Sequence, residues 1–105
     1  MVTEINQDPI LEFSKKTAVV VFYASWCGDC ARSMAYERAL SKELAPKVTF
    51  YRMDAEKYEK IADNYWVENY PTYVFFRDGV ADKDILVEPR SEEEVRLWLN
   101  AKMRS

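Results

Sequence analysis

Two cysteines, the only ones in this chain of 105 residues, stand three positions apart in the segment Trp26-Cys27-Gly28-Asp29-Cys30. An apolar, β-branched run precedes them, and a segment of helical composition follows from Ala31 to Leu44. The first cysteine therefore falls at a predicted helix start, where unpaired N–H groups and partial positive charge favour a thiolate. Because residues i and i+3 share one helix face, the two sulfurs can close a small disulfide ring. This pattern predicts thiol–disulfide chemistry.

Two other interpretations of the cysteine pair remain open at this point. A zinc site needs four nitrogen, sulfur or oxygen ligands, and the sequence has no histidine and no further cysteine. A cysteine–histidine site within one chain is therefore excluded, whereas a metal or iron–sulfur site shared between two chains is not. An inert pair of core cysteines is the other alternative. We expect neither a metal nor any other cofactor.

Length and composition indicate a single domain spanning residues 1–105, with 49% hydrophobic and 31% charged residues. The net charge of −3 offers no basic surface for nucleic acid or an anionic membrane. No apolar run reaches the length of a membrane span, and the first residues lack the basic start and apolar run of a signal peptide. We therefore expect a cytoplasmic protein, in which paired cysteines are more often catalytic or metal-binding than structural.

Strands and helices are predicted to alternate along the chain. The apolar run from Ala18 to Tyr23 is typical of a central strand buried on both faces. Asp78-Gly79 predicts a hairpin, and Ser91 begins a capping box with Glu94. The predicted strands span 2–5, 18–23, 48–53, 73–77 and 80–87, and the predicted helices span 8–16, 27–45, 54–65 and 91–103. This order predicts an α/β fold with a mixed central β-sheet flanked by helices, in which the hairpin is antiparallel and the strands joined through helices are parallel.

Three segments give the chain a clear resemblance to the thioredoxin family over nearly its whole length. They are Phe22 to Cys30, Tyr70-Pro71-Thr72, and Phe75 to Gly79. The resemblance implies the thioredoxin fold, with a cis peptide bond before Pro71 and with this proline facing the cysteines. It also implies that an extended substrate pairs with the backbone at Tyr70, as an added β-strand would.

The same resemblance assigns a role to each site residue. Cys27 would attack a substrate disulfide, and Cys30 would resolve the mixed disulfide that forms. Gly28 and Asp29, between the two cysteines, would tune the redox couple. The residues expected to contact the substrate are Trp26, Tyr70, Pro71, Thr72 and Glu88.

The sequence departs from the family pattern at five positions. Asp29 replaces a proline, Val21 replaces a buried acid, and Phe50 aligns with a lysine near that acid. Ala35 aligns with a proline that kinks the family's helix, and Glu88 is the nearest match to a glycine opposite the proline loop. A carboxylate at Asp29 repels a thiolate at Cys27, so we expect a reductant rather than an oxidant or isomerase. The alternative is a solvated aspartate without redox effect. Without the acid at position 21, the Cys30 proton would pass to water or to Asp29, and resolution would be slow at neutral pH.

These observations together predict a small monomeric thiol–disulfide oxidoreductase that reduces protein disulfides. Family resemblance implies that an NADPH-dependent thioredoxin reductase regenerates its dithiol. Three alternatives stay open: a specialised reductase serving one partner, a binding or scaffold module with regulatory cysteines, and a disulfide isomerase-type domain.

Overall fold

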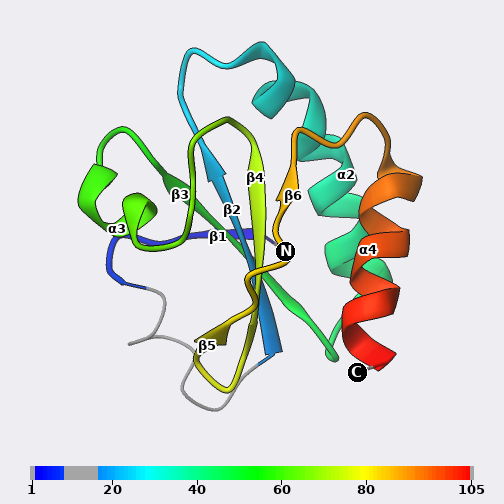
Figure 1. Cartoon of the computed structure of the whole chain (residues 1–105). Helices are drawn as coiled ribbons and strands as arrows, with labels where there is room; N and C mark the ends of the chain where they lie inside the picture. Colours follow the sequence, from blue (N-terminus) through cyan, green and yellow to red (C-terminus); the bar gives the residue numbers. More distant parts are fainter. Residues whose placement is uncertain (1, 9–16, 105) are drawn as a thin grey trace.

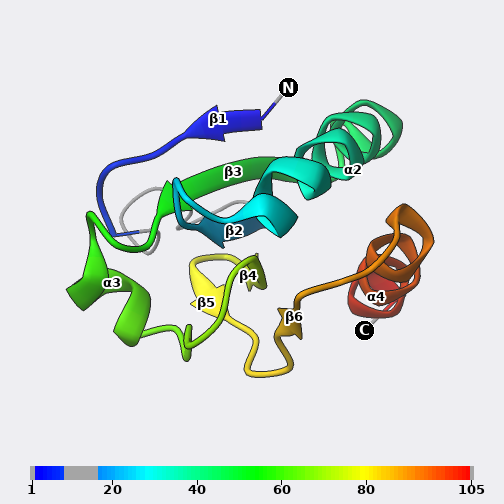
Figure 2. The same cartoon turned by 90° about the horizontal axis from the view of Figure 1, so that it is seen from above.

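The computed structural model describes residues 2–8 and 17–104. Its elements, in chain order, are β1 (Val2–Glu4), β2 (Thr17–Tyr23), α2 (Gly28–Leu44), β3 (Thr49–Asp54), α3 (Glu59–Asp63), β4 (Thr72–Arg77), β5 (Val80–Ala81), β6 (Leu86–Val87) and α4 (Glu92–Arg104). The predicted helix at 8–16 lies outside the described residues except for its first position. One central sheet separates α3 on one face from α2 and α4 on the other (Figures 1 and 2).

The sheet is mixed, with strand order β1-β3-β2-β4-β5 and with β6 also paired to β4. β1 and β2 both run parallel to β3, whereas β4 runs antiparallel to β2. The mixed sheet was predicted, but the expectation that strands joined through helices are parallel is wrong for β3 and β4, which α3 joins and which run in opposite directions. The reason is the length of α3, because five residues rise only about 8 Å, less than half the length of a six-residue strand. The chain therefore enters β4 at the end of the sheet where β3 finished.

Two hydrophobic clusters fill the two sides of β2. Val20 and Phe22 face the cluster that includes Ala62 of α3, and Val19 and Val21 face the cluster shared with α2 and α4. All four of these β2 side chains are fully buried. The prediction of a central strand buried on both faces is therefore confirmed.

The helix predicted for residues 54–65 is much shorter in the structure. The Asp54 carboxylate accepts the N–H groups of Glu56 and Lys57, which forms a turn before the helix rather than a helix cap. Only Glu59–Asp63 is α-helical, so Tyr65 lies beyond the helix although it is still buried in the core.

The strand predicted for residues 80–87 is divided into β5 and β6. Between them, the Asp84 N–H bonds to the Asp82 carboxylate at 2.8 Å, which closes a local loop. The ammonium group of Lys102, near the end of α4, contacts both carboxylates at 3.0 and 2.8 Å. Charge pairing with a distant helix therefore favours a loop where the local pattern predicted a continuous strand.

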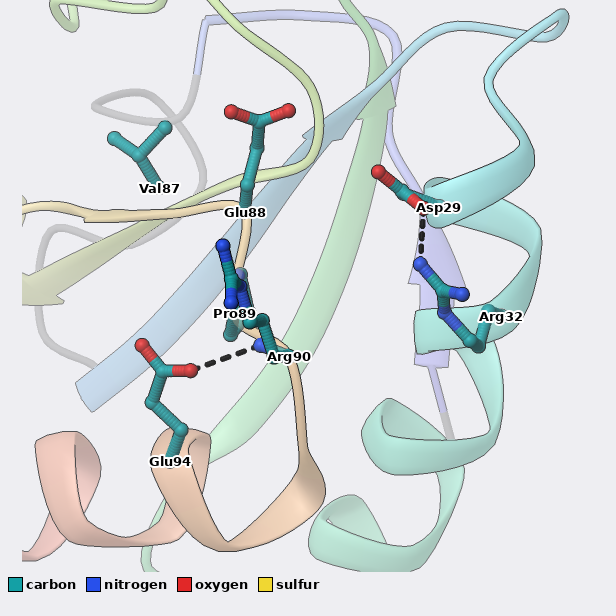
Figure 3. A pocket seen from close by; sticks show the side chains of 7 residues that line it. All are labelled: Asp29, Arg32, Val87, Glu88, Pro89, Arg90 and Glu94. Atoms are coloured by element: carbon teal, nitrogen blue, oxygen red, sulfur yellow. Dashed lines mark hydrogen bonds and ion pairs between the residues drawn. The ribbon is translucent and has the colours of Figure 1, made fainter.

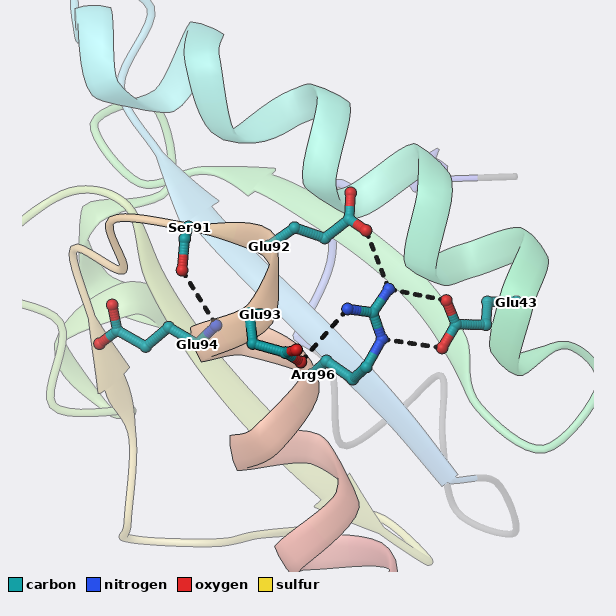
Figure 4. A network of polar contacts seen from close by, with 6 residues as sticks. All are labelled: Glu43, Ser91, Glu92, Glu93, Glu94 and Arg96. Carbon is teal, nitrogen blue, oxygen red and sulfur yellow. Dashed lines mark hydrogen bonds and ion pairs between the residues drawn. The ribbon is translucent and has the colours of Figure 1, made fainter.

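Contacts in the first turns of α4 hold this helix against α2. The Glu94 N–H bonds to the Ser91 hydroxyl at 3.2 Å, as a capping serine does, whereas the Glu94 carboxylate accepts the N–H of Arg90. Arg96 then reaches across to α2 and binds both carboxylate oxygens of Glu43, at 2.8 and 3.0 Å (Figure 4). These contacts and the apolar cluster beneath them fix the helix that carries the cysteines.

Candidate functional site

The cysteine pair lies at the start of α2, directly beyond the end of β2. Cys27 is the N-cap residue, and its sulfur accepts the Cys30 N–H at 3.1 Å. Its thiol is also 3.5 Å from the carbonyl oxygen of Tyr70, across the groove. Cys27 is half-buried and Cys30 is only 2% exposed. The outer sulfur can therefore meet another molecule, while the inner one is reached through its partner.

Burial has a large effect on the inner thiol. It raises the pKa of Cys30 to about 12, and the hydrogen bond to Cys27 and the negative charges of Cys27 and Glu37 act in the same direction. Cys30 therefore carries its proton at neutral pH. A small cavity of about 210 Å³, bordered by both cysteines, Tyr23 and Arg52, adjoins this pair.

The loop before β4 forms the opposite wall of the groove. The Tyr70–Pro71 peptide bond is cis, and the Pro71 carbonyl accepts the Glu88 N–H at 2.8 Å. Trp26 is 67% exposed and packs edge-on against Tyr70 with ring centroids 5.8 Å apart. A cavity of about 390 Å³ joins these parts, lined by Trp26, Cys27, Gly28, Asp29, Glu68, Asn69, Tyr70 and Glu88.

The structure thus brings most of the predicted site residues together around Cys27. Thr72 differs, because it is fully buried and its hydroxyl donates to the Asn69 carbonyl at 2.6 Å. Its side chain shapes the proline loop, and direct contact with a substrate has no support in this geometry. Pro71 is also buried, so only its loop borders the groove.

Glu88 has an unusual backbone conformation. Its φ of 48° lies in the left-handed region, which glycine adopts most readily. Its side chain lies between the groove at Cys27 and a second cavity of about 650 Å³, across which Asp29 and Arg32 lie opposite Arg90 (Figure 3). A carboxylate therefore lies where the family pattern places no side chain.

Asp29 forms an exposed ion pair with Arg32, one turn further along α2 (Figure 3). Exposed pairs of this kind are worth about 1 kcal/mol or less, but the cation offsets part of the Asp29 charge near Cys27. Redox tuning by Asp29 and Gly28 stays a prediction. The hypothesis that Asp29 takes the Cys30 proton has no supporting contact here.

The buried groups near Cys30 differ from those expected. Val21 is fully buried, and its neighbour on β3 is Arg52 rather than Phe50, so the basic residue near this position was missed. A buried acid was missed as well, because Glu37 on α2 is only 1% exposed. The signal was its spacing, since Cys30, Ser33 and Glu37 recur at three and four residues along one helix face.

Metal binding and membrane insertion find no support in the described residues. Within residues 2–8 and 17–104, no three histidine, cysteine or acidic side chains are grouped as a metal site would require. None of the helices in that part of the chain combines the length and apolar character needed to cross a membrane.

Comparison with known proteins gives a consistent result. The family model named Thioredoxin matches residues 1–101. A 72-residue stretch, 69% of the chain, is 39% identical to thioredoxin Y, chloroplastic, of Oryza sativa subsp. japonica, of which the match spans only 43%. Over 94% of the chain and 93% of the relative, identity to the thioredoxin of Rickettsia typhi is 31%.

The fold is also similar to that of solved thioredoxin structures. The X-ray structure of Fasciola hepatica thioredoxin superimposes with a TM-score of 0.75 and 32% identity, covering 88% of this chain and 86% of that one. The predicted thioredoxin fold is thereby confirmed. With the Cys27–Cys30 spacing, the family match and this structural likeness all in agreement, the chain belongs to the thioredoxin family.

Proposed function

We propose that this chain is a thiol–disulfide oxidoreductase that reduces protein disulfides through Cys27 and Cys30. The observation that carries the proposal is the position of the Cys27 sulfur. It caps α2, accepts the Cys30 N–H at 3.1 Å and faces the Tyr70 carbonyl across an open groove. A sulfur that borders an open groove can reach the disulfide of another molecule, as disulfide exchange requires.

The reaction follows from which sulfur is accessible. The Cys27 thiolate attacks one sulfur of the substrate disulfide, and the other substrate sulfur leaves as a thiolate. Cys30 then loses its proton and attacks the Cys27 sulfur, which releases the second substrate sulfur and closes the Cys27–Cys30 disulfide. Two electrons thus pass from the dithiol to the substrate, and the substrate thiolates take up protons from water.

Substrate docking is proposed at the groove between Trp26 and the proline loop. The exposed Trp26 ring supplies apolar surface, and the Tyr70 backbone borders the groove beside Cys27. An extended peptide that pairs with this backbone places its disulfide against the nucleophile. This arrangement favours turnover over a purely scaffolding role.

Reduction of insulin by the purified protein, driven by dithiothreitol, tests the proposal. We expect turnover by the wild type and none above background by Cys27→Ser. Cys30→Ser should instead accumulate a covalent mixed disulfide with the substrate, visible by mass spectrometry. If the folded wild type shows no turnover, the scaffold alternative is favoured, and a reduction potential in the range of about −180 to −120 mV favours the isomerase or oxidase class.

The wider setting also belongs to the proposal. We propose one domain over residues 1–105, acting as a monomer in the cytoplasm and regenerated by an NADPH-dependent thioredoxin reductase. A reducing compartment suits a dithiol that must be kept reduced. Reduction by a purified reductase of this type with NADPH tests the partner, and light scattering tests the oligomeric state. A specialised form of the activity is favoured by one observation, the Glu88 side chain in the groove.

A further inference from the structure

Glu37 is a buried acid that the reaction described above does not use. It lies on the inner face of α2, seven residues beyond Cys30, and is 1% exposed. Helical side chains lean toward the N-terminus of their helix, so this carboxylate is directed back toward the turn that carries Ser33 and Cys30. A carboxylate in such a place is costly unless it is fully paired.

The pairing of Glu37 is incomplete. Its Oε2 atom accepts hydrogen bonds from the hydroxyl groups of Ser33, at 2.9 Å, and Tyr73, at 3.1 Å. Its Oε1 atom has no hydrogen-bond partner among the described residues. Arg52 Nε is also buried without a hydrogen bond among the described residues, and it lies 4.0 Å from a carboxylate oxygen of Glu4. Glu37 and Arg52 therefore interact electrostatically in the core beside the redox centre, without a hydrogen bond between them.

Three elements place ionisable or polar groups around this carboxylate. α2 contributes Cys30, Ser33 and Arg38, β3 contributes Arg52, and β4 contributes Tyr73. Burial raises the pKa of Glu37, while the hydrogen bonds and the two arginines lower it by smaller amounts. In return, the negative charge of Glu37 raises the pKa of the Cys30 thiol.

We propose that Glu37 is a positioning residue of the redox centre, whose buried negative charge holds the proton on Cys30 and so limits the rate of resolution. The proposal rests on the thiol–disulfide exchange proposed above. Its effect is greatest in the mixed disulfide, because Cys27 is then bonded to substrate and no longer carries charge. The burial of Cys30 and the negative charge of Glu37 then still oppose ionisation of the Cys30 thiol. A negative charge on Glu37 disfavours a second one on Cys30.

The test is a single-turnover reaction of the reduced protein with dithiobis(nitrobenzoate). The first phase reports attack by Cys27, and the second reports release of nitrothiobenzoate when Cys30 resolves the mixed disulfide. Glu37→Gln keeps the shape and can still accept both hydroxyl hydrogen bonds, but it removes the charge. We expect its second phase to be about three- to tenfold faster at pH 7–8. We also expect a less reducing couple.

Two further variants test the role of the charge. Ser33→Ala also removes a hydrogen bond that holds down the pKa of Glu37, so it should shift the rate in the same direction as Glu37→Gln. Glu43→Gln removes an exposed carboxylate from the same helix and should resolve at the wild-type rate. The proposal is overturned if Glu37→Gln resolves at the wild-type rate, or if it resolves more slowly, as loss of a proton acceptor predicts. A missing first phase contradicts the proposed function instead.

A measurement on the wild type keeps the proposal testable if Glu37→Gln does not fold. Coupled groups share their titration steps, so the carboxyl carbon of Glu37 should report Cys30 ionisation in an NMR titration of the reduced protein. We expect a main step for Glu37 and a second, smaller step at alkaline pH that disappears in Cys30→Ser. A single step in both proteins overturns the coupling.

Discussion

Replacing Glu88 by glycine should stabilise this protein. A non-glycine residue in the left-handed region destabilises the folded state by roughly 1–2 kcal/mol, and glycine removes this strain. Glycine also makes the unfolded chain more flexible, which offsets about 0.5–1 kcal/mol of the gain. With φ at 48° for Glu88, we expect Glu88→Gly to gain about 0.5–1 kcal/mol. For a domain of this size, that corresponds to a rise in Tm of roughly 2–6 °C. The hydrogen bond from its N–H to Pro71 belongs to the backbone and is kept.

Glu88→Gln is the matched control, because it removes the charge but keeps the side chain and the strained φ. Its free energy of unfolding should stay within about 0.5 kcal/mol of the wild type, as for most surface changes. Calorimetry of the wild type, Glu88→Gly and Glu88→Gln measures these differences in stability. The reasoning about strain is refuted if Glu88→Gly is no more stable than Glu88→Gln.

The same variants test whether the Glu88 carboxylate selects substrates. It lines the groove at Cys27 together with Asp29 and Glu68, so an acidic disulfide should be disfavoured. One unit charge at 4–8 Å in water changes the energy by about 0.5–1 kcal/mol, or roughly two- to fivefold in rate. Both variants should therefore raise the rate with oxidised glutathione relative to cystamine by about that factor at low salt. Equal ratios in all three proteins would show that this charge does not act on substrates.

Three further predictions follow from other parts of the structure. Leu99 is fully buried between α4 and the sheet, so Leu99→Ala should cost about 2–5 kcal/mol in urea unfolding, and a loss below 1 kcal/mol would contradict its place in the core. Ser91→Ala should cost about 1 kcal/mol by the same assay because it removes the cap of α4, whereas an unchanged midpoint would show that Glu94 alone holds this end. The rate of resolution by Cys30 should rise about tenfold per pH unit between pH 7 and 9, because burial keeps its pKa far above this range and only the thiolate attacks. A flat profile in the stopped-flow second phase would contradict this assignment.

Local signals were sufficient for the parts of the site that lie close together in sequence. The apolar run to Tyr23 and the cysteine spacing predicted β2 and the start of α2, because burial on both faces leaves a continuous apolar pattern. The expectation that Pro71 lies near the cysteines came from the resemblance to the family motif, and not from the hydrophobic pattern. Contacts between elements that are distant in sequence could not be predicted from these local signals. The break after Ala81 depends on Lys102, twenty-one residues later.

The buried charges were missed for a related physical reason. An acid in a helix is usually solvated, and only the spacing of Glu37 from Cys30 indicated that its side chain lies on the inner face. Arg52 could be assigned only once the register of β2 and β3 was known. Strand direction was also wrong for β4, because the predicted helix at 54–65 was long enough to return the chain and the real α3 is not.

The burial of β2 on both faces has a consequence for hydrogen exchange. This strand is paired on both edges, to β3 and β4, and both hydrophobic clusters rest on it. Its amide hydrogens can therefore exchange with solvent only when the whole domain opens, whereas β6, at the sheet edge, can open locally. Cys27 follows β2 by four residues and is tied back to it through Ala24. The reactive sulfur is thus attached to a strand whose amide hydrogens exchange slowly, and the redox cycle can proceed without local unfolding.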